Sequence, residues 1–506
     1  MNHATARIAA WASGLSLADV PESAVERARL QTAAGIAAAR AGAGARAVSQ
    51  LRAATRGWAA KGPSAVVGER FKLEPAAAAY ANAAASIAHD WDDYLYMGHT
   101  GHSAVWASRA VGESTDASDE QVLVAQIAAN EVAGRIGAAL FLGPHNGQFW
   151  SSIHCAGAAV AAGKVMGLDE ERLAHAIAVA LYQPPYGLWP GFMGPDTKLL
   201  TAADPTMQGI RAAVLAAEGL SGPLDVIEDR RGFLAHLSFA PRPSMLEGLG
   251  RVWLTDTLAF KPYPGCAYLQ SAVEALLRLR AEEGFEADDV AAVEVRGGYL
   301  TTGMERLAAG PTLTPVRVNF SVALSLPVCL LAGRLTHEEL DEPWLAERED
   351  ELRRLASRVR LEHDWDLTLA TVRGAADAMP LEATIGDVPP SGWLTVRRRM
   401  RELGMDELEL GWGDLRELLG RTDVRSAVLG LVRGGRAGDG RARGLEALDV
   451  ERLRLTFPTH VRVRLRSGAS FETDGREPGA CGAPISEQRE VVERKEALTG
   501  GKSVHI

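Results

Sequence analysis

Hydrophobic residues in the first half of the chain recur with the 3.6-residue period of amphipathic helices, and many of them are alanines. This spacing predicts helices over residues 21–39, 73–88, 122–140 and 168–181, and another that begins at Asp204 and Pro205 and ends before Gly219. Ser118 and Gln121 have the form of a capping box in front of the third helix, because each side chain can bond a free backbone N–H. Period-two alternation is nearly absent, so residues 1–260 are predicted to form a helical domain.

After about residue 260 the pattern changes to short stretches in which hydrophobic and polar residues alternate, as in half-buried strands. Strands are predicted over residues 291–296, 358–362 and 461–465, and helices over 272–280, 319–332 and 486–498. Residues 261–471 are therefore predicted to form an α+β domain. Within it, residues 365–450 are rich in Arg, Gly and Glu and poorly periodic, so we treat them as an insertion of uncertain structure. Its run Arg433–Arg436 is predicted to be a flexible basic loop.

Composition and charge narrow the class of protein. The 506 residues are 47% hydrophobic and 23% charged, which suits a large core and two domains. The net charge of −10 and the lack of a concentrated basic segment argue against a nucleic-acid partner. No apolar stretch has the length of a membrane span, and the first residues lack the pattern of a signal peptide. The four cysteines are scattered without a CxxC pair, so a reducing, cytoplasmic location is expected.

The densest group of reactive side chains lies in residues 89–103, where three acids and three histidines share fifteen positions. One interpretation is a helix end with solvated acids; if the helix continued to residue 93, His89 and Asp93 would share a face. A second is a divalent-metal site, since His and Asp clusters bind such ions. A third is a proton-transfer site in which a carboxylate holds a histidine that works near neutral pH.

Three later segments carry further candidate chemistry. His154 begins a helix of small residues, and Lys198 follows a loop rich in Gly, Pro and aromatics that could surround an anion. Taken alone, each also suits a structural role. Lys261 lies in a proline-stiffened segment at the predicted domain junction, where clefts are common. Cys266, in the same segment, has no pattern that supports a nucleophile. Only seven of the 54 basic residues are lysines, so lysines in such settings stand out.

These four segments, in this order, resemble the MmgE/PrpD family, which includes 2-methylcitrate dehydratase, cis-aconitate decarboxylase and iminodisuccinate epimerase. The resemblance covers residues 5–335 and resumes over 461–495. The residues that carry it are Asp90-Trp91-Asp92-Asp93, His99, His154, Thr197-Lys198 before the helix at Gly209, and Lys261-Pro262-Tyr263-Pro264-Gly265-Cys266.

The chain departs from the family pattern at three places. Tyr94 replaces a threonine, and Thr100-Gly101-His102 replaces Pro-Ser-small, which leaves His102 as a rival of His99. The residues after Phe320-Ser321 lack the tyrosine that the family often has there. These differences bear on which substrate the protein would accept.

The resemblance implies a large helical domain, completed by residues 472–506, and a smaller α+β domain with the active-site cleft between them. It implies a homodimer, a small carboxylate substrate, and a site that needs neither cofactor nor metal. The residues it places at the site are Asp90, His99, His154, Lys198 and Lys261 as catalytic groups, with Tyr94, His102, Thr197, Tyr263 and Cys266 as substrate contacts.

The family's chemistry removes a proton from a carbon beside a carboxylate. Lys198 and Lys261 would stabilise the resulting negative charge, His99 or His154 would move the proton, and Asp90 would orient the imidazole. We therefore expect a lyase, foremost a hydro-lyase similar to 2-methylcitrate dehydratase, with decarboxylation or epimerisation as alternatives. Rivals are a divalent-metal hydrolase that uses His89, Asp90, Asp93, His99 and His102, and an inactive family member that acts as a binding protein.

Overall fold

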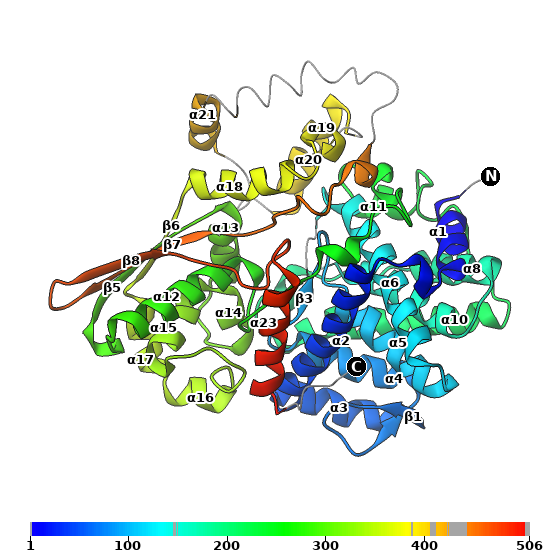
Figure 1. Cartoon of the computed structure of the whole chain (residues 1–506), viewed down its shortest axis with the longest axis horizontal. Helices are drawn as coiled ribbons and strands as arrows, with labels where there is room; N and C mark the ends of the chain where they lie inside the picture. Colours follow the sequence, from blue (N-terminus) through cyan, green and yellow to red (C-terminus); the bar gives the residue numbers. More distant parts are fainter. Residues whose placement is uncertain are drawn as a thin grey trace.

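The computed structural model describes residues 3–144, 148, 150–385, 388–404, 411–421, 424 and 443–500. Small side chains let the helices of the first half pack closely. At Gly209 of α10, for example, an added Cβ would lie 2.3 Å from the Cys155 carbonyl oxygen of α7. The longer helices of this part are α1 (Ala4–Gly14), α2 (Glu22–Ala43), α3 (Arg46–Trp58), α4 (Pro75–Ile87), α5 (Gly101–Thr115), α6 (Asp119–Leu140), α7 (Ser151–Val165), α8 (Glu170–Tyr182) and α10 (Leu200–Ala217) (Figure 1).

Local signals located several of these helices well. The Ser118–Gln121 capping box is present at the start of α6, with both reciprocal hydrogen bonds. The predicted start at Asp204 and Pro205 was wrong, because both residues lie inside α10. Proline removes one N–H from the helix and crowds the carbonyl four residues earlier, but the turn before Pro205, which includes the buried Ala202 and Ala203, packs well enough for the helix to continue.

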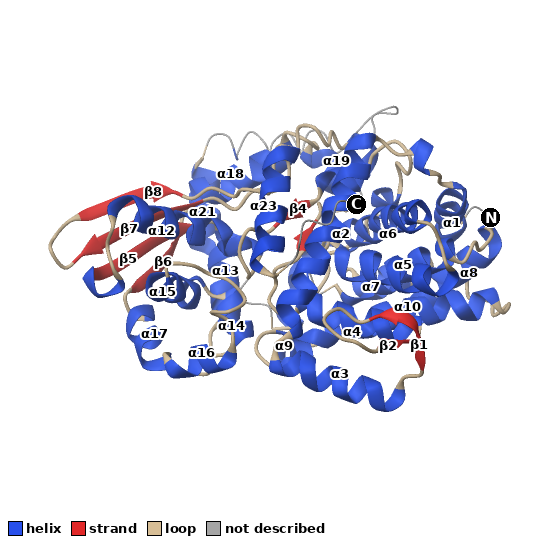
Figure 2. Cartoon of the chain, turned by 60° about the horizontal axis from the view of Figure 1, so that its bottom comes forward, coloured by secondary structure: helices blue, strands red, loops and turns tan. Residues whose placement is uncertain are grey.

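A four-stranded mixed sheet organises the second half, in the order β6-β5-β7-β8. Its strands are β5 (Val290–Gly297), β6 (Val359–His363), β7 (Thr459–Leu465) and β8 (Ser470–Asp474). Only the β5–β6 pair is parallel. In Figure 2 the sheet fans out at the end of the molecule opposite α1 and α8. The predicted strands therefore lie within a few residues of the observed ones, and the prediction of a mainly α fold with an α+β part is confirmed.

Helices pack beside this sheet around a second hydrophobic core. They are α12 (Gln270–Glu283), α13 (Tyr299–Ala308), α14 (Pro315–Phe320), α15 (Val322–Ala332), α16 (Glu342–Glu347) and α17 (Glu349–Ala356). The helix expected over residues 319–332 is two helices, because Ser321 adopts an extended conformation. Its hydroxyl accepts a hydrogen bond from the Leu324 N–H and so caps α15.

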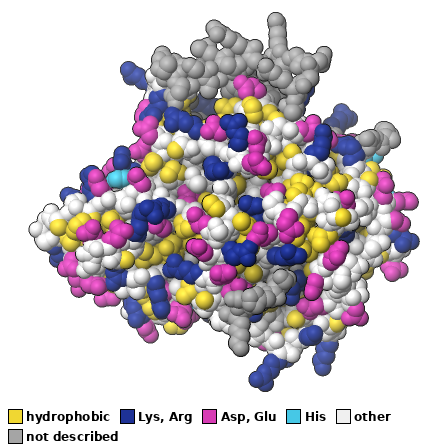
Figure 3. Space-filling view, in the orientation of Figure 1, with side chains coloured by type: hydrophobic (Ala, Val, Ile, Leu, Met, Phe, Trp, Pro, Cys, Tyr) yellow, Lys and Arg dark blue, Asp and Glu magenta, His cyan; other side chains and the backbone are white. Residues whose placement is uncertain are grey.

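The stretch 365–450 contains short helices where the structure describes it, namely α18 (Trp365–Ala376), α19 (Leu381–Ile385), α20 (Pro390–Glu402) and α21 (Trp412–Gly420). The predicted basic loop Arg433–Arg436 lies outside the described residues. No helix in the described ranges combines the length and apolarity that crossing a bilayer would require. On the face drawn in Figure 3, acidic and basic side chains are interspersed over the described residues.

The end of the chain returns to the helical part. The last helix, α23 (Ile485–Leu498), packs against α2 and against β4 (Ala259–Phe260). Strand β4 in turn pairs antiparallel with β3 (Asp93–Tyr94). Three segments that are far apart in the sequence thus meet in one place: residues 89–103, residues 259–266 and the C-terminal helix. The domain boundaries at residues 260 and 472 stay a prediction.

Candidate active site

The acidic segment leaves the helix before its carboxylates. Helix α4 ends at Ile87, so His89 and Asp93 do not share a helical face. Asp90 adopts the left-handed conformation, with φ of +52°, which is uncommon for a residue with a side chain. This turn directs the chain into β3, whose pairing with Ala259–Phe260 sets Lys261 beside the acids. The strained turn is therefore the local feature that builds the site.

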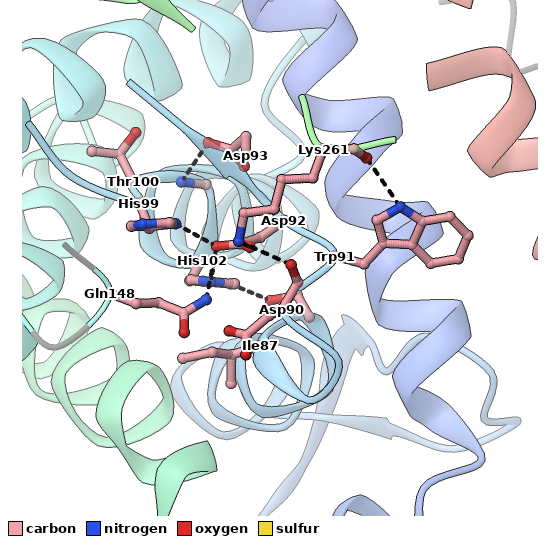
Figure 4. A network of polar contacts seen from close by, with 12 residues as sticks. Ile87, Asp90, Trp91, Asp92, Asp93, His99, Thr100, His102, Gln148 and Lys261 are labelled. Atoms are coloured by element: carbon pink, nitrogen blue, oxygen red, sulfur yellow. Dashed lines mark hydrogen bonds and ion pairs between the residues drawn. The ribbon is translucent and has the colours of Figure 1, made fainter. Parts of the chain in front are cut away.

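Asp92 is the centre of the polar network drawn in Figure 4. One carboxylate oxygen lies 2.5 Å from Lys261 Nζ. The other lies 2.7 Å from His99 Nδ1 and 3.0 Å from both His102 Nε2 and Gln148 Nε2. Burial alone would raise the pKa of Asp92, but the Lys261 ammonium and the two imidazoles hold it well below its usual value. Asp92 is thus a buried anion, and the expectation that Asp90 orients the catalytic imidazole was wrong.

The two histidines on Asp92 differ in what their second nitrogen can do. An ionised carboxylate only accepts hydrogen bonds, so each imidazole nitrogen that faces Asp92 carries a proton. The other nitrogen of His102, Nδ1, lies 2.7 Å from the Ser86 hydroxyl, and the side chain is 2% exposed. His99 is 13% exposed, and its Nε2 bonds none of the described residues. The geometry therefore favours His99 over His102 as the reactive imidazole.

Two buried lysines flank these acids, and their pKa values shift in opposite directions. Lys198 Nζ lies 2.8 Å from the Asp90 carboxylate and donates to the Ile87 carbonyl. Burial lowers the pKa of Lys198, although Asp90 partly offsets this. Lys261 Nζ bonds both Asp92 and the Asp90 carbonyl. Burial also lowers the pKa of Lys261, but Asp92 and Asp90 outweigh it, so the net change is upward. Lys261 is a fixed cation, whereas Lys198 is the lysine that loses its proton more readily.

His154 is fully buried at the start of α7. Its Nδ1 lies 3.2 Å from the Ser103 hydroxyl, and its Nε2 has no hydrogen-bond partner among the described residues. Burial first, and then the neighbouring histidines, hold its pKa well below the usual value, so the imidazole is neutral. Its ring centroid lies 5.7 Å from that of His102. His154 is therefore a neutral imidazole that packs against His102 and whose Nε2 bonds none of the described residues.

A cavity of about 600 Å³ lies between the helical and α+β parts. Lys198 and His89 line it from the helical side, and His337 lines it from the segment after α15. Burial lowers the pKa of His89 to about 3, so this imidazole is neutral. His99 and His154 are not among the lining residues, so Lys198 and its partner Asp90 connect the cavity with the network behind it.

The remaining predicted substrate contacts lie outside the hydrogen-bond network. The ring centroids of Tyr94 and His99 are 6.0 Å apart. The Thr197 hydroxyl donates to the Gly191 carbonyl, and the Tyr263 ring lies under the Arg494 guanidinium. Burial raises the pKa of the Cys266 thiol to about 12, so it is not a thiolate. Within the described part of the chain, no group of three or more His, Cys, Asp or Glu residues has the geometry of a metal site.

Two residues that contact this network were not predicted from the sequence. Gln148 reaches Asp92 from the segment before α7, and no motif marks it. Lys495, on α23, is 1% exposed and donates to the Trp91 carbonyl oxygen. The scarcity of lysine in this chain was the signal that could have drawn attention to Lys495, since no motif surrounds it.

Comparisons with known proteins show which family the chain resembles. The family model described as the MmgE/PrpD N-terminal domain matches residues 6–245, and that of the MmgE/PrpD C-terminal domain matches residues 263–384. A cis-aconitate decarboxylase of Aspergillus terreus is 30% identical over 295 residues, which are 54% of this chain and 60% of the relative. A cis-aconitate decarboxylase-like protein of Aspergillus oryzae is 25% identical over 301 residues, 54% of this chain and 61% of that protein. The chain thus matches about 60% of the length of these curated relatives.

Proposed function

Because the chain belongs to the MmgE/PrpD family, we propose that it is a lyase that acts on a small di- or tricarboxylic acid without a cofactor. One observation carries the proposal: the reactive imidazole of His99 is held by the Asp92 carboxylate, which also bonds the Lys261 ammonium, and Lys198 leads from this group to the cavity. A carboxylate, an imidazole and two buried cations are the parts needed to move a proton beside a substrate carboxylate.

Each group has a chemical role in this proposal. His99 Nε2 takes or returns the proton, while its Nδ1–H donates to Asp92, which fixes the ring and favours the imidazolium that forms. The negative charge that develops on the substrate carboxylate is stabilised by Lys198 at the cavity wall. Lys261 keeps Asp92 ionised. His154, a neutral imidazole with a free nitrogen, is the candidate for the second proton step.

The same groups can serve two outcomes. In dehydration, the carbanion beside the carboxylate expels a β-hydroxyl, which leaves as water after it gains a proton. In decarboxylation of an unsaturated acid, CO2 leaves from the allylic carbon, the electron pair spreads over the double bond, and an imidazolium protonates the far carbon. The sequence favoured dehydration of a substrate similar to 2-methylcitrate. The names of the matched relatives favour decarboxylation of cis-aconitate as the second candidate.

The test is an NMR assay in D2O with a panel that contains cis-aconitate, citrate and 2-methylcitrate. Deuterium in the recovered substrate beside a carboxylate reports reversible proton removal, CO2 release with deuterium in the product reports decarboxylation, and a new alkene without CO2 reports dehydration. The variants Lys198→Ala and His99→Gln should each lower turnover by on the order of 100-fold. His175→Gln is the matched control, because His175 lies on α8 and bonds Gly222, away from the network.

Other outcomes would point elsewhere. Activity that a chelator removes and a divalent ion restores would support a metal hydrolase instead. Neither exchange nor turnover with any member of the panel would support an inactive binding protein. Retained turnover in both variants would refute the assigned roles. A homodimer, expected from family likeness, and a cytoplasmic location, expected from the scattered cysteines, are part of the proposal, and light scattering of the purified protein tests the dimer.

A further inference from the structure

Lys495 is a buried cation that the mechanism above does not use. It lies on α23, one turn before the end of the helix at Leu498, and only 1% of it is exposed. Its ammonium donates to the Trp91 carbonyl oxygen and lies 5.5 Å from the centroid of the Trp91 ring. A cation that faces an aromatic ring and a carbonyl, and forms no carboxylate pair among the described residues, is an unusual use of a buried lysine.

Trp91 connects Lys495 to the groups of the proposed site. The indole Nε1 donates to the Lys261 carbonyl at 3.0 Å. The Lys261 ammonium returns to the same turn, where it bonds the carbonyl of Asp90 and the carboxylate of Asp92. Trp91 is therefore held at both ends, by Lys495 at its carbonyl and by Lys261 at its indole. Its two chain neighbours carry the carboxylates that pair with the site lysines.

The turn needs such support because it is strained. Asp90 has a φ of +52° and is fully buried, so its conformation is held by its surroundings and not by its own preference. The Asp90 N–H bonds the Ile87 carbonyl, and the segment enters a strand of only two residues. The contact from Lys495 is the one that anchors the middle of the turn from the side of α23.

We propose that Lys495 is a positioning residue of the active site: its ammonium fixes the Trp91 carbonyl and so holds Asp90 and Asp92 where Lys198 and His99 need them. The inference rests on the function proposed above. The proposal gives the C-terminal helix a part in supporting the site, although Lys495 lies 404 positions after Trp91 in the sequence. A displacement of about 1 Å in such a group can lower a rate by on the order of 100-fold.

The charge on Lys495 gives the proposal a signature. Burial lowers the pKa of Lys495 to about 7, against the opposing effect of Asp92 and Asp93 and with a further lowering by Lys261. Helix α2 packs against α23, and its Glu26 forms an ion pair with Arg489 of α23. Because a neutral amine binds the carbonyl and the ring more weakly, kcat should decline above about pH 7 as the ammonium is lost. An arginine at this position stays charged throughout that range.

The experiment compares Lys495→Met, Lys495→Arg and a control, Lys164→Met. Lys164 is a suitable match because its ammonium also donates to backbone carbonyls, those of Ala12, Ser13 and Leu15, but away from the site. We expect Lys495→Met to lower kcat by on the order of 100-fold with KM changed much less, while Lys164→Met keeps wild-type kcat. Lys495→Arg should recover part of the activity and should lack the decline above about pH 7.

Hydrogen–deuterium exchange separates this inference from the function on which it rests. Backbone amides of residues 88–98 should exchange faster in Lys495→Met than in the wild type. In Lys164→Met, these amides should exchange at the wild-type rate. If the wild type converts no substrate but the exchange differs as expected, the proposed function fails and the positioning of the turn stands. Unchanged exchange over residues 88–98, or equal loss of kcat in both methionine variants, would overturn the inference. If Lys495→Arg does not fold, the exchange and kcat of Lys495→Met still decide.

Discussion

Two adjacent buried aspartates should respond very differently to the same isosteric change. Asp92 is held ionised by Lys261, His99 and His102, whereas burial raises the pKa of Asp93 above its usual value. Asp92→Asn removes the charge that balances Lys261 and turns an oxygen into an NH2 group. In either orientation the amide sets a donor against donors, either Lys261 or the two imidazoles and Gln148.

The magnitudes follow from what each carboxylate bonds. Removing one partner of a buried ion pair costs about 3–5 kcal/mol, so Asp92→Asn should lower the free energy of unfolding by about that amount at pH 7. Asp93 accepts from Gln31 Nε2 at 2.7 Å and from the Gly101 N–H at 3.3 Å. An amide oxygen can accept both, and burial, which raises the pKa of Asp93, makes a neutral group less costly at this position. Asp93→Asn should therefore stay within about 1 kcal/mol of the wild type.

The pKa shift of Asp92 also fixes the direction in which stability changes with pH. The folded-state pKa of Asp92 lies below its unfolded value, so its contribution is present above the unfolded pKa and is lost as the pH falls through the folded one. Urea unfolding of the wild type and both variants from pH 7 to pH 3 measures this. The gap between the wild type and Asp92→Asn should narrow toward low pH. Equal effects of the two substitutions at pH 7, or a gap that widens in acid, would refute the reasoning.

Two further predictions concern stability. Folding lowers the pKa of Lys495 from 10.5 to about 7, so the unfolded chain binds more protons between these values and wild-type stability should rise with pH across that window. The pKa shift corresponds to up to about 5 kcal/mol of unfolding free energy. Lys495→Met should therefore be more stable than the wild type in urea unfolding below pH 7, and this difference in stability should shrink toward pH 10.5. Gly101→Ala would place a Cβ 2.0 Å from an Asp93 carboxylate oxygen and should cost about 1–3 kcal/mol by thermal unfolding, whereas Gly14→Ala, with no atom within 4 Å, should cost nothing.

Interactions between residues close together in the sequence made part of the fold predictable. The capping box at Ser118 and the alternation of β5 depend on neighbours within a few residues, and both are where the sequence placed them. Asp204 and Pro205 were misread because a buried α10 overrides a local start signal. The break at Ser321 within the expected helix 319–332 was missed for a similar reason, since Glu305 of α13, which no periodicity reveals, bonds the Ser321 hydroxyl.

Several of the predicted site residues lie together in the structure, but the hydrogen bonds and ion pairs between them could not be predicted from the sequence. Family likeness named Asp90, and the structure gives the histidine contacts to Asp92, two positions later. Nothing local distinguishes these acids, because the difference arises from the left-handed turn at Asp90 and from the pairing of β3 with β4. Lys495 escaped for the same reason: its partner, Trp91, lies on a segment that only the fold brings to the last helix.

The free energy that is needed to bury so many ionisable side chains in one cluster is an argument about function. The three buried lysines and the three buried acids around the turn are Lys198, Lys261, Lys495, Asp90, Asp92 and Asp93. Buried charges are poor sources of stability, because desolvation cancels most of their attraction. Lys261 and Asp92 shift so as to remain an ion pair, whereas burial pushes Asp93 and Lys495 toward their neutral forms. As the pH falls through about 7, Lys495 gains its proton, and burial disfavours the charge on Asp93, so the cluster becomes more positive. A cluster that gains positive charge in this range suits a substrate that carries carboxylates, and Lys198 at the cavity wall is where that charge would meet them.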